Sequence, residues 1–301
     1  MQVLVGSNGW AAKSAIHLLF EKGYVSNRDN LVVYSRTQRV FEISGVGSRT
    51  AREWIPRKER EKVENFFPFA FLTADKFSEM SEVEYREQNT KLINKAADYI
   101  SLNKPSNCVL FSSGIVGPES LNLNRDRGYK VYRELKLLEE ECIRKACHDA
   151  GTNLVVCRLF SASGRYLRDF RKYALGNLIW QAKFINKIVL TSTNAVWRRY
   201  IDMSQIIEIC MLETRNCDFR VVESGGELIE IESLASKIAK IYNCKVINRN
   251  ELHGEEDSYF SRLQDIEDLA ARFGIGLFSI DEQINETIKG LEKSWSKGLI
   301  K

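Results

Sequence analysis

A tyrosine and a lysine stand four residues apart at Tyr132 and Lys136, in the run Y-R-E-L-K. On a helix, side chains with this spacing share one face. A tyrosine that exchanges a proton near neutral pH needs a pKa below its ordinary value of about 10, and a nearby ammonium shifts the pKa in that direction. We therefore interpret Tyr132 as a general acid or base and Lys136 as its cation. The alternative is an ordinary solvated pair on a helix.

Two serines follow a short apolar run upstream of this pair. Ser112 and Ser113 come directly after residues 108–111, in the motif S-S-G-I-V-G-P. Substrates of parallel-sheet proteins bind at the carboxyl ends of the strands, where a hydroxyl can bond a reacting carbonyl oxygen. Ser113 is the first candidate for this role, and a shift of one residue would assign it to Ser112. A structural turn is the alternative.

A glycine-containing turn connects the first strand-like run, residues 3–5, to the first helix-like segment. It has the spacing G-x-x-G-x-x-A. Gly6 permits a tight turn, Gly9 lets the backbone approach phosphate oxygens, and Ala12 still allows close helix–strand packing. Such a turn presents backbone N–H groups to a pyrophosphate, unless it is a simple structural turn. The predicted dinucleotide-binding residues are Gly6, Ser7, Asn8, Gly9 and Trp10.

The second strand-like run ends in Tyr34, Ser35 and Arg36. An acidic residue often stands at this point and binds the ribose hydroxyls of NAD. Arg36 and the Ser35 hydroxyl can instead hold a 2′-phosphate. We therefore predict NADP as the cofactor, with NAD as the alternative if Arg36 only begins a basic surface loop.

Strand-like and helix-like segments alternate through the first half of the chain. The strand-like runs are 3–5, 31–34, 69–72, 108–111 and 153–159, and the helix-like ones are 11–22, 82–100 and 129–150. Repeated β–α units indicate a parallel sheet with helices on both faces. We predict an α/β fold with a Rossmann-type doubly wound parallel sheet over residues 1–160. The basic stretch 36–62 is interpreted as a solvated loop and helix face.

The second half is less regular. Helices are expected at 176–186, 203–213, 231–242, 264–273 and 281–291, and strands at 187–190, 219–223 and 245–247. It contains no Pro- or Ser-rich linker and no internal repeat. We therefore expect residues 161–301 to form a smaller C-terminal lobe, mainly substrate-binding and interleaved with the first domain.

The glycine turn, the serine motif and Y-x-x-x-K together resemble the extended short-chain dehydrogenase/reductases. Within them the chain resembles the NAD-dependent epimerase/dehydratase family, which modifies nucleotide-activated sugars, and the likeness runs over nearly the whole chain. The resemblance implies that Tyr132 and Lys136 also contact the cofactor. R-L-F at 158–160 is similar to the family's segment near the nicotinamide, N-L-I at 177–179 to one that contacts the nucleotide sugar, and R-R-Y at 198–200 to a stretch whose Arg binds the diphosphate. Further expected site residues are Thr73 and Leu159 for the cofactor, and Asn177 and Arg198 for the substrate.

The sequence also departs from the family pattern. The V-Y-G common after the serines is V-G-P here, and the short span from Ser113 to Tyr132 predicts a trimmed substrate loop. Gln205 stands where an Asp is usual after R-x-Y. The family's dehydratases carry Asp-Glu after the serine, so Gly-Ile at 114–115 disfavours dehydration. The alternative for Arg198 is a surface arginine paired with Asp202.

Three functions stay open. The first is an NADP(H)-dependent oxidoreductase that reduces a keto group of a nucleotide-activated sugar, with Tyr132 as proton donor and Ser113 polarising the oxygen. The second is a nucleotide-sugar epimerase with tightly bound NAD. The third is a non-catalytic NADP-binding sensor or scaffold, since fold alone does not establish chemistry. The complete Ser/Tyr/Lys set favours an enzyme, and Arg36 favours the reductase.

Composition narrows the classes further. The 301 residues are 44% hydrophobic and 28% charged, as in globular proteins, with a net charge of +4 spread along the chain. We expect no nucleic-acid partner, no membrane span and no signal peptide, because strand-like residues begin at once. Seven cysteines without CxxC spacing indicate structural thiols in a reducing cytoplasm and no metal site. The expected partners are a nucleotide sugar and, at most, a second copy of the chain in a homodimer.

Overall fold

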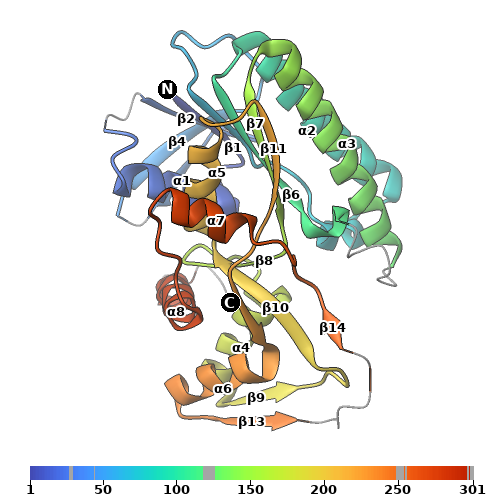
Figure 1. Ribbon diagram of the computed structural model, residues 1–301, viewed down its shortest axis with the longest axis vertical. Helices are drawn as coiled ribbons and strands as arrows, with labels where there is room; N and C mark the ends of the chain where they lie inside the picture. The colour runs from blue at the N-terminus through green and yellow to red at the C-terminus, as the bar shows by residue number, and fades with distance from the viewer. Residues whose placement is uncertain are drawn as a thin grey trace. The chain divides into compact units, whose positions relative to one another are not determined.

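The computed structural model describes residues 1–26, 30–43, 45–117, 126–248, 254, 256–296 and 298. The chain divides into two compact units. Unit 1 contains Met1–Leu159 and Ile207–Glu223, and unit 2 contains Phe160–Ile206 and Ser224–Lys301. The chain therefore leaves unit 1 after Leu159 and returns to it for one short stretch (Figure 1).

Unit 1 is built on one sheet of eight strands in the order β11-β7-β6-β5-β1-β2-β4-β3. All neighbouring strands are parallel except β3, which is antiparallel to β4. The strands are β1 (Gln2–Val5), β2 (Leu31–Ser35), β3 (Arg39–Ile43), β4 (Gly47–Glu53), β5 (Asn65–Pro68), β6 (Asn107–Ser113), β7 (Asn153–Leu159) and β11 (Phe219–Glu223). From β1 the chain builds first to one side through β2 and then to the other through β5, so the switch point lies at β1. The predicted doubly wound Rossmann-type sheet is confirmed.

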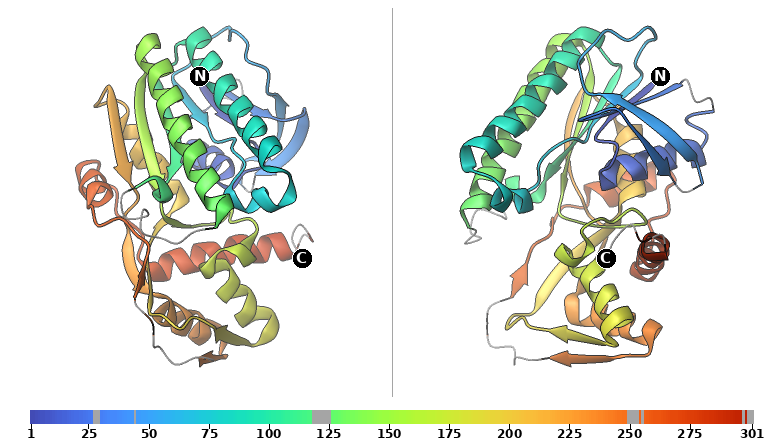
Figure 2. Two further views of the ribbon diagram at one scale, coloured as in Figure 1. Left: turned by 90° about the vertical axis from the view of Figure 1, so that its right-hand side faces the viewer. Right: turned by 180° about the vertical axis from the view of Figure 1, so that it is seen from behind.

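The helices of unit 1 cover both faces of this sheet (Figure 2). They are α1 (Trp10–Glu21), α2 (Glu82–Asn103) and α3 (Arg127–Ala150), with the end of α5 (Met203–Glu213). Alternate strand residues such as Val3 and Val5 enter a core with Tyr99 of α2 and Ile143 of α3, because side chains along a strand point to opposite faces. Helices α2 and α3 lie side by side on that face, and α1 lies on the other (Figures 1 and 2).

Local signals set the ends of α2 and α3. The Ser81 hydroxyl accepts a bond from the Glu84 amide at 3.2 Å, and the Asp126 carboxylate accepts one from the Tyr129 amide at 3.1 Å. Such caps satisfy amides that the first turn of a helix leaves unbonded. Gly151 ends α3 in the left-handed conformation. These caps place Tyr132 in the second turn of α3.

Two predictions about unit 1 are wrong. The stretch 36–62 is not a loop and helix face: it contains the β3–β4 hairpin and then an extended segment in which Trp54 is buried. One side of the hairpin is buried through Phe41, Ile43 and Ala51. This apolar side is enough to form a half-buried edge ribbon, although the stretch contains many basic residues. The strand expected at 69–72 lies instead at Asn65–Pro68, in β5. Asn65–Pro68 form the strand because they pair in register with β1.

Unit 2 contains two small sheets and several helices. One sheet has the order β12-β10-β14, with β8 also paired to β10, and the other joins β13 to β9. The strands are β8 (Ser161–Ser163), β9 (Lys187–Leu190), β10 (Val196–Asp202), β12 (Glu227–Glu230), β13 (Lys245–Asn248) and β14 (Asp257–Ser258). The helices are α4 (Ala174–Trp180), α6 (Ile231–Tyr242), α7 (Asp265–Arg272) and α8 (Ile280–Ser296). In the described part of the chain, no helix is both long and apolar enough to span a bilayer.

Candidate functional site

The turn between β1 and α1 has the backbone geometry of a close-approach loop. Gly6 has φ +101°, which a side chain would strain, and a Cβ there would lie 3.3 Å from the Ala70 amide nitrogen after β5. The Gly6 amide donates to the Tyr34 carbonyl at 2.9 Å, and the Gly9 amide donates to the Gly6 carbonyl at 2.8 Å. The turn is thereby fixed at the switch point between β1 and β5.

The groups in this turn fit the pyrophosphate of a dinucleotide. The Ser7 side chain is fully buried, and its Oγ has no hydrogen-bond partner among the described residues, which is costly unless a ligand supplies one. Gly9 caps α1 without a side-chain bond, so the cap residue itself does not occupy the first-turn amides. Asn8 completes the turn and Trp10 begins the helix.

The end of β2 differs in detail from the prediction. Ser35 is buried and its hydroxyl donates to the Thr37 carbonyl, so its proton is already used within the loop. Arg36 is exposed and forms no ion pair or hydrogen bond with any residue in the described ranges. Arg36 is therefore the group at this strand end that can meet a phosphate.

Ser113 and Tyr132 lie together at the end of β6. The Ser113 side chain lies close enough to Tyr132 to lower its pKa, and the Ser113 hydroxyl accepts from the Ile115 amide at 3.4 Å. The Tyr132 ring packs edge-on against Phe71, with ring centres 5.8 Å apart. Ser112 is buried, and its Oγ has no partner among the described residues. Contact with Tyr132 therefore favours Ser113 over Ser112 as the hydroxyl that would meet a substrate oxygen.

Lys136 is held differently from the prediction. Its Nζ donates to Glu139 Oε2 at 2.7 Å and to the Phe111 carbonyl at 3.0 Å, and it lies 3.8 Å from the centre of the Phe71 ring. Lys136 and Glu139 are both about 4% exposed. The pKa of Tyr132 is raised rather than lowered in this structure: desolvation raises it, the Glu139 charge raises it further, and the Ser113 side chain offsets this only in part.

Sequence reasoning missed Glu139. Residues three apart on a helix are neighbours, so the spacing K-x-x-E from Lys136 was the signal that could have revealed this ion pair. The next residue, Glu140, binds both Nε and Nη2 of Arg158 on β7 at 3.1 and 2.9 Å. Two consecutive carboxylates of α3 thus hold two different cations.

The remaining predicted residues of unit 1 lie at strand and helix ends. Thr73 caps the short helix η2 (Ala74–Glu79), and its hydroxyl bonds the Asp75 carboxylate. Leu159 ends β7 and pairs in register with Ser113 on β6. Pro118 and the rest of the predicted trimmed loop, 119–125, lie outside the described residues.

Unit 2 contains a pocket of about 210 Å³ around Asn177. Leu178, Val189 and Val196 give it apolar walls, and Glu230 contributes a carboxylate. The side-chain amide of Asn177 makes no hydrogen bond to another described residue. An amide beside apolar walls and a carboxylate suits a planar ring with N–H and carbonyl groups.

Arg198 is already paired. Its Nη1 and Nη2 donate to Asp257 Oδ1 and Oδ2 at 3.1 and 3.2 Å, and Nη1 also donates to the Asp257 carbonyl at 3.0 Å. Asp202, the alternative partner considered from sequence, instead accepts a bond from the Ser204 amide at 2.8 Å. The guanidinium fork of Arg198 thus holds a carboxylate in the geometry that also suits phosphate.

Gln205 explains one departure from the family pattern. Its amide nitrogen donates to the Gly276 carbonyl at 2.7 Å, and its amide oxygen accepts from the Phe278 amide at 2.9 Å. An ionised aspartate can only accept hydrogen bonds. The Gln205 amide therefore bonds both Gly276 and Phe278, in the segment before α8. An aspartate could not donate the bond to the Gly276 carbonyl.

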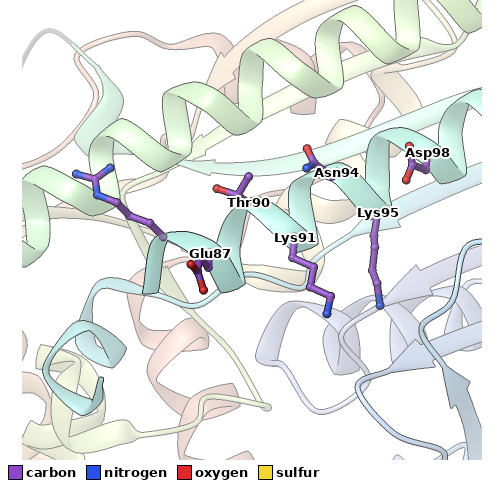
Figure 3. A pocket seen from close by; sticks show the side chains of 7 residues that line it. Glu87, Thr90, Lys91, Asn94, Lys95 and Asp98 are labelled. Carbon is purple, nitrogen blue, oxygen red and sulfur yellow. The ribbon is translucent and has the colours of Figure 1, made fainter. Parts of the chain in front are cut away.

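A wider hollow of about 560 Å³ runs along α2. Its lining comes from this one helix, and Lys91 and Lys95 extend to the same side of it (Figure 3). Glu87 and Asp98 place acidic groups among the basic ones. This hollow contains none of the predicted site residues. We therefore assign the candidate active site to the carboxyl ends of β1 and β6, where the predicted glycine turn and serines stand.

No protein-family model matches the sequence, and no curated protein matches it. Solved structures do match its fold along nearly its whole length. MoeE5, solved with UDP-glucose and NAD, has a TM-score of 0.70 at 17% identity and covers 98% of this chain and 99% of its own. The UDP-N-acetylglucosamine 4-epimerase of Methanobrevibacter ruminantium M1, solved with UDP-N-acetylmuramic acid, has a TM-score of 0.72 at 14% identity, with 97% and 98% coverage.

TunA, an NAD-dependent NDP-hexosamine 5,6-dehydratase involved in tunicamycin biosynthesis, is also similar. Its TM-score is 0.69 at 14% identity, with 97% of this chain and 98% of TunA covered. The predicted resemblance to the NAD-dependent epimerases and dehydratases is thereby confirmed for the fold. At these identities the likeness establishes the fold and does not identify a substrate.

Proposed function

We propose that this protein is a nicotinamide-dependent oxidoreductase that reduces a keto group of a nucleotide-activated sugar. The observation that supports it is the proximity of Ser113 and Tyr132 at the carboxyl end of β6, where the Ser113 side chain lowers the pKa of Tyr132, next to the buried Lys136. Hydroxyls at this edge of a parallel sheet can bind a substrate oxygen directly. A sensor or scaffold would have no use for this set of groups.

The residues that would hold the cofactor lie along the switch point. Gly6 and Gly9 let the backbone approach the pyrophosphate, and the Ser7 hydroxyl supplies a donor. Lys136 has three ammonium hydrogens, and its two bonds to Glu139 and Phe111 leave one for a ribose hydroxyl. The bound nicotinamide would supply the hydride.

The chain's own residues would bind the oxygen and supply the proton. Ser113 donates a hydrogen bond to the carbonyl oxygen and so favours the negative charge that grows there. Tyr132 then gives its proton to the same oxygen. Because the pKa of Tyr132 is raised by burial, the phenol keeps its proton at neutral pH. This protonation state suits reduction.

A nucleotide-sugar epimerase is the second candidate. The similar epimerase from Methanobrevibacter ruminantium M1 favours it. An epimerase begins by oxidising the sugar, and Tyr132 would then have to accept a proton as a phenolate, which its raised pKa opposes. The exposed Arg36 also favours NADPH, a cofactor that reductases consume.

One assay separates the two candidates. The protein is mixed with NADPH or NADH and a panel of nucleotide sugars that includes 4-keto derivatives, and the absorbance of the reduced cofactor is followed. We expect consumption with a keto sugar and much slower consumption with Tyr132→Phe. Interconversion of two nucleotide sugars without net consumption, detected by NMR, would instead establish the epimerase. Neither reaction with any member of the panel would contradict the proposal.

The cofactor preference depends on Arg36. We expect NADPH to bind more tightly than NADH, and Arg36→Ala to weaken NADPH by roughly 10- to 100-fold, since a charged hydrogen bond contributes about 1.5–3 kcal/mol. NADH affinity should stay the same because it lacks the 2′-phosphate. Titration calorimetry with both cofactors measures this, and Arg39→Ala on the neighbouring β3 is the matched control. Equal affinities in the unmodified protein would refute the preference.

The role of Arg198 is tested through its partner. If Arg198 binds the substrate diphosphate, the phosphate must replace the Asp257 carboxylate. Asp257→Asn should then strengthen binding of nucleoside diphosphate sugars by up to about fivefold, because a partly exposed pair contributes about 1 kcal/mol or less. Arg198→Lys should weaken it and leave NADPH binding unchanged. Loss of sugar-nucleotide affinity in Asp257→Asn would show that the pair is only structural.

A further inference from the structure

Lys136 lies in a pair that the proposed chemistry does not require. Its ammonium donates to Glu139, one turn further along α3, and both side chains are almost completely buried. The same Nζ is held by the Phe111 carbonyl of β6 and faces the Phe71 ring. The cation one turn after Tyr132 on α3 is therefore compensated by a carboxylate at 2.7 Å.

Stability alone is a poor reason for such a pair. Removing two charges from water is costly, and apolar side chains of similar volume are often as stable or more so. Val131 and Leu135 of the same helix are buried without charge, so α3 accepts apolar residues in its inward-facing positions. A role beside the reacting groups explains why charges stand at 136 and 139.

We propose that Glu139 is a positioning residue that acts through Lys136. It fixes the ammonium against the Phe111 carbonyl and compensates its charge, so that Tyr132 remains a protonated phenol and begins the reaction as a proton donor. This inference rests on the proposed keto reduction, and it assigns the starting protonation state of Tyr132 to a residue that touches neither substrate nor cofactor. Without the carboxylate, the uncompensated ammonium would favour the phenolate.

Other charged and titratable groups also act on Tyr132 and Glu139. Asp75 of η2 and Tyr129 of α3 also raise the pKa of Tyr132, and Tyr85 of α2 interacts with it electrostatically. Glu140 raises the pKa of Glu139, Lys136 lowers it, and burial raises it most. The Cys108 thiol of β6 also faces Glu139. Lys136 is thus the cation in this group, and Glu139 is the carboxylate that binds it.

The pH dependence follows from the sign of these shifts. The acid form of Tyr132 is present below its raised pKa, so reduction by the unmodified protein should stay constant from neutral pH to about pH 10. Glu139→Gln keeps the shape of the side chain and removes its charge. The pKa of Tyr132 should then fall by about one unit or more. The rate of reduction should begin to fall at a lower pH than in the parent. The rate of oxidation of the product alcohol should rise near neutral pH.

The direct test follows tyrosinate absorbance in protein without added ligand. Each protein is titrated with alkali over the range in which circular dichroism shows the fold intact. The chain has 11 tyrosines, so the Tyr132 component is the difference between each protein and its Tyr132→Phe derivative. We expect the Tyr132 component of Glu139→Gln to titrate within that range, at a lower pH than in the parent. Glu139→Asp, which keeps the charge, should behave like the parent.

Glu134→Gln is the matched control on the same helix, because Glu134 is exposed and pairs with Arg86. It should leave the Tyr132 component unchanged. An unchanged component in Glu139→Gln would overturn the inference. So would an equal shift in Glu134→Gln, since the effect would then not be specific to position 139.

A second variant covers the case in which Glu139→Gln does not fold. The double change Lys136→Gln with Glu139→Gln replaces the ion pair by two amides, and the inference expects the Tyr132 component of the parent. A rise in the pKa of Tyr132 in this variant would show that Lys136 lowers it in the parent, which contradicts the inference. The titration needs no turnover, so it can succeed even if no nucleotide sugar is a substrate and the proposed function fails.

Discussion

Replacing Tyr132 by phenylalanine is expected to lower turnover of the keto sugar by roughly 10²–10⁴-fold, which is the usual contribution of a positioned general acid. The change removes only the hydroxyl. The ring keeps its edge-on contact with Phe71, so the free energy of unfolding should change little. Ser113 still accepts from the Ile115 amide. Turnover is measured with saturating NADPH, and cofactor affinity separately by calorimetry.

Tyr129→Phe is the matched control for this experiment. Tyr129 lies in the first turn of α3, three residues before Tyr132, and is partly exposed. It should retain nearly full turnover. Near-normal turnover in Tyr132→Phe, with the true substrate present, would contradict the proposed mechanism. Loss of turnover in both variants would indicate damage to the start of α3 rather than loss of an acid.

The sequence was sufficient where the signal is local. The spacing of Gly6 and Gly9 predicted the turn between β1 and α1, and the helix containing Tyr132 begins within two residues of its predicted start because Asp126 caps it. Ser113 and Tyr132 were expected together because a strand end and the start of the next helix must meet at one edge of the sheet. The effect of Ser113 on the pKa of Tyr132 fits that expectation. The roles of both residues stay predictions.

The sequence was insufficient where pairing is long-range or ambiguous. The apolar run from Phe66 to Leu72 fits a strand at several positions, and pairing of Asn65–Pro68 with β1 decides between them. Arg198 and Asp257 are far apart in the chain, and strand β14 brings them together. Glu139 is close in sequence to Lys136, yet residue spacing does not reveal that both are buried. Burial makes their pairing dominant over an effect of Lys136 on Tyr132.

Lys136→Ala should damage stability, cofactor binding and turnover together. It leaves the Glu139 carboxylate buried without its partner, and breaking a buried pair in this way costs about 3–5 kcal/mol in the free energy of unfolding. It also removes the proposed donor to the cofactor ribose. Denaturant unfolding measures the first effect, and calorimetry with NADPH and turnover measure the others. Lys76→Ala, which removes a partly exposed lysine paired with Glu79, is the control and should have little effect.

The loss of stability in Lys136→Ala should depend on pH in a defined direction. Burial already raises the pKa of Glu139 in the folded state, and loss of Lys136 removes the charge that lowers it. A group whose pKa is raised on folding stabilises the fold below its unfolded pKa, about 4.3 for glutamate, and this contribution is lost as pH rises through the folded pKa. The variant should therefore be closest to the parent in mild acid and furthest from it above neutral pH.

Changing Lys136 to Met and Glu139 to Leu together should recover most of the stability without recovering turnover, because the packing is restored and the ammonium is not. A Lys136→Ala protein as stable as the parent at every pH would mean that Glu139 reaches water or another partner, and the buried pair would then have no role in holding α3 to the sheet.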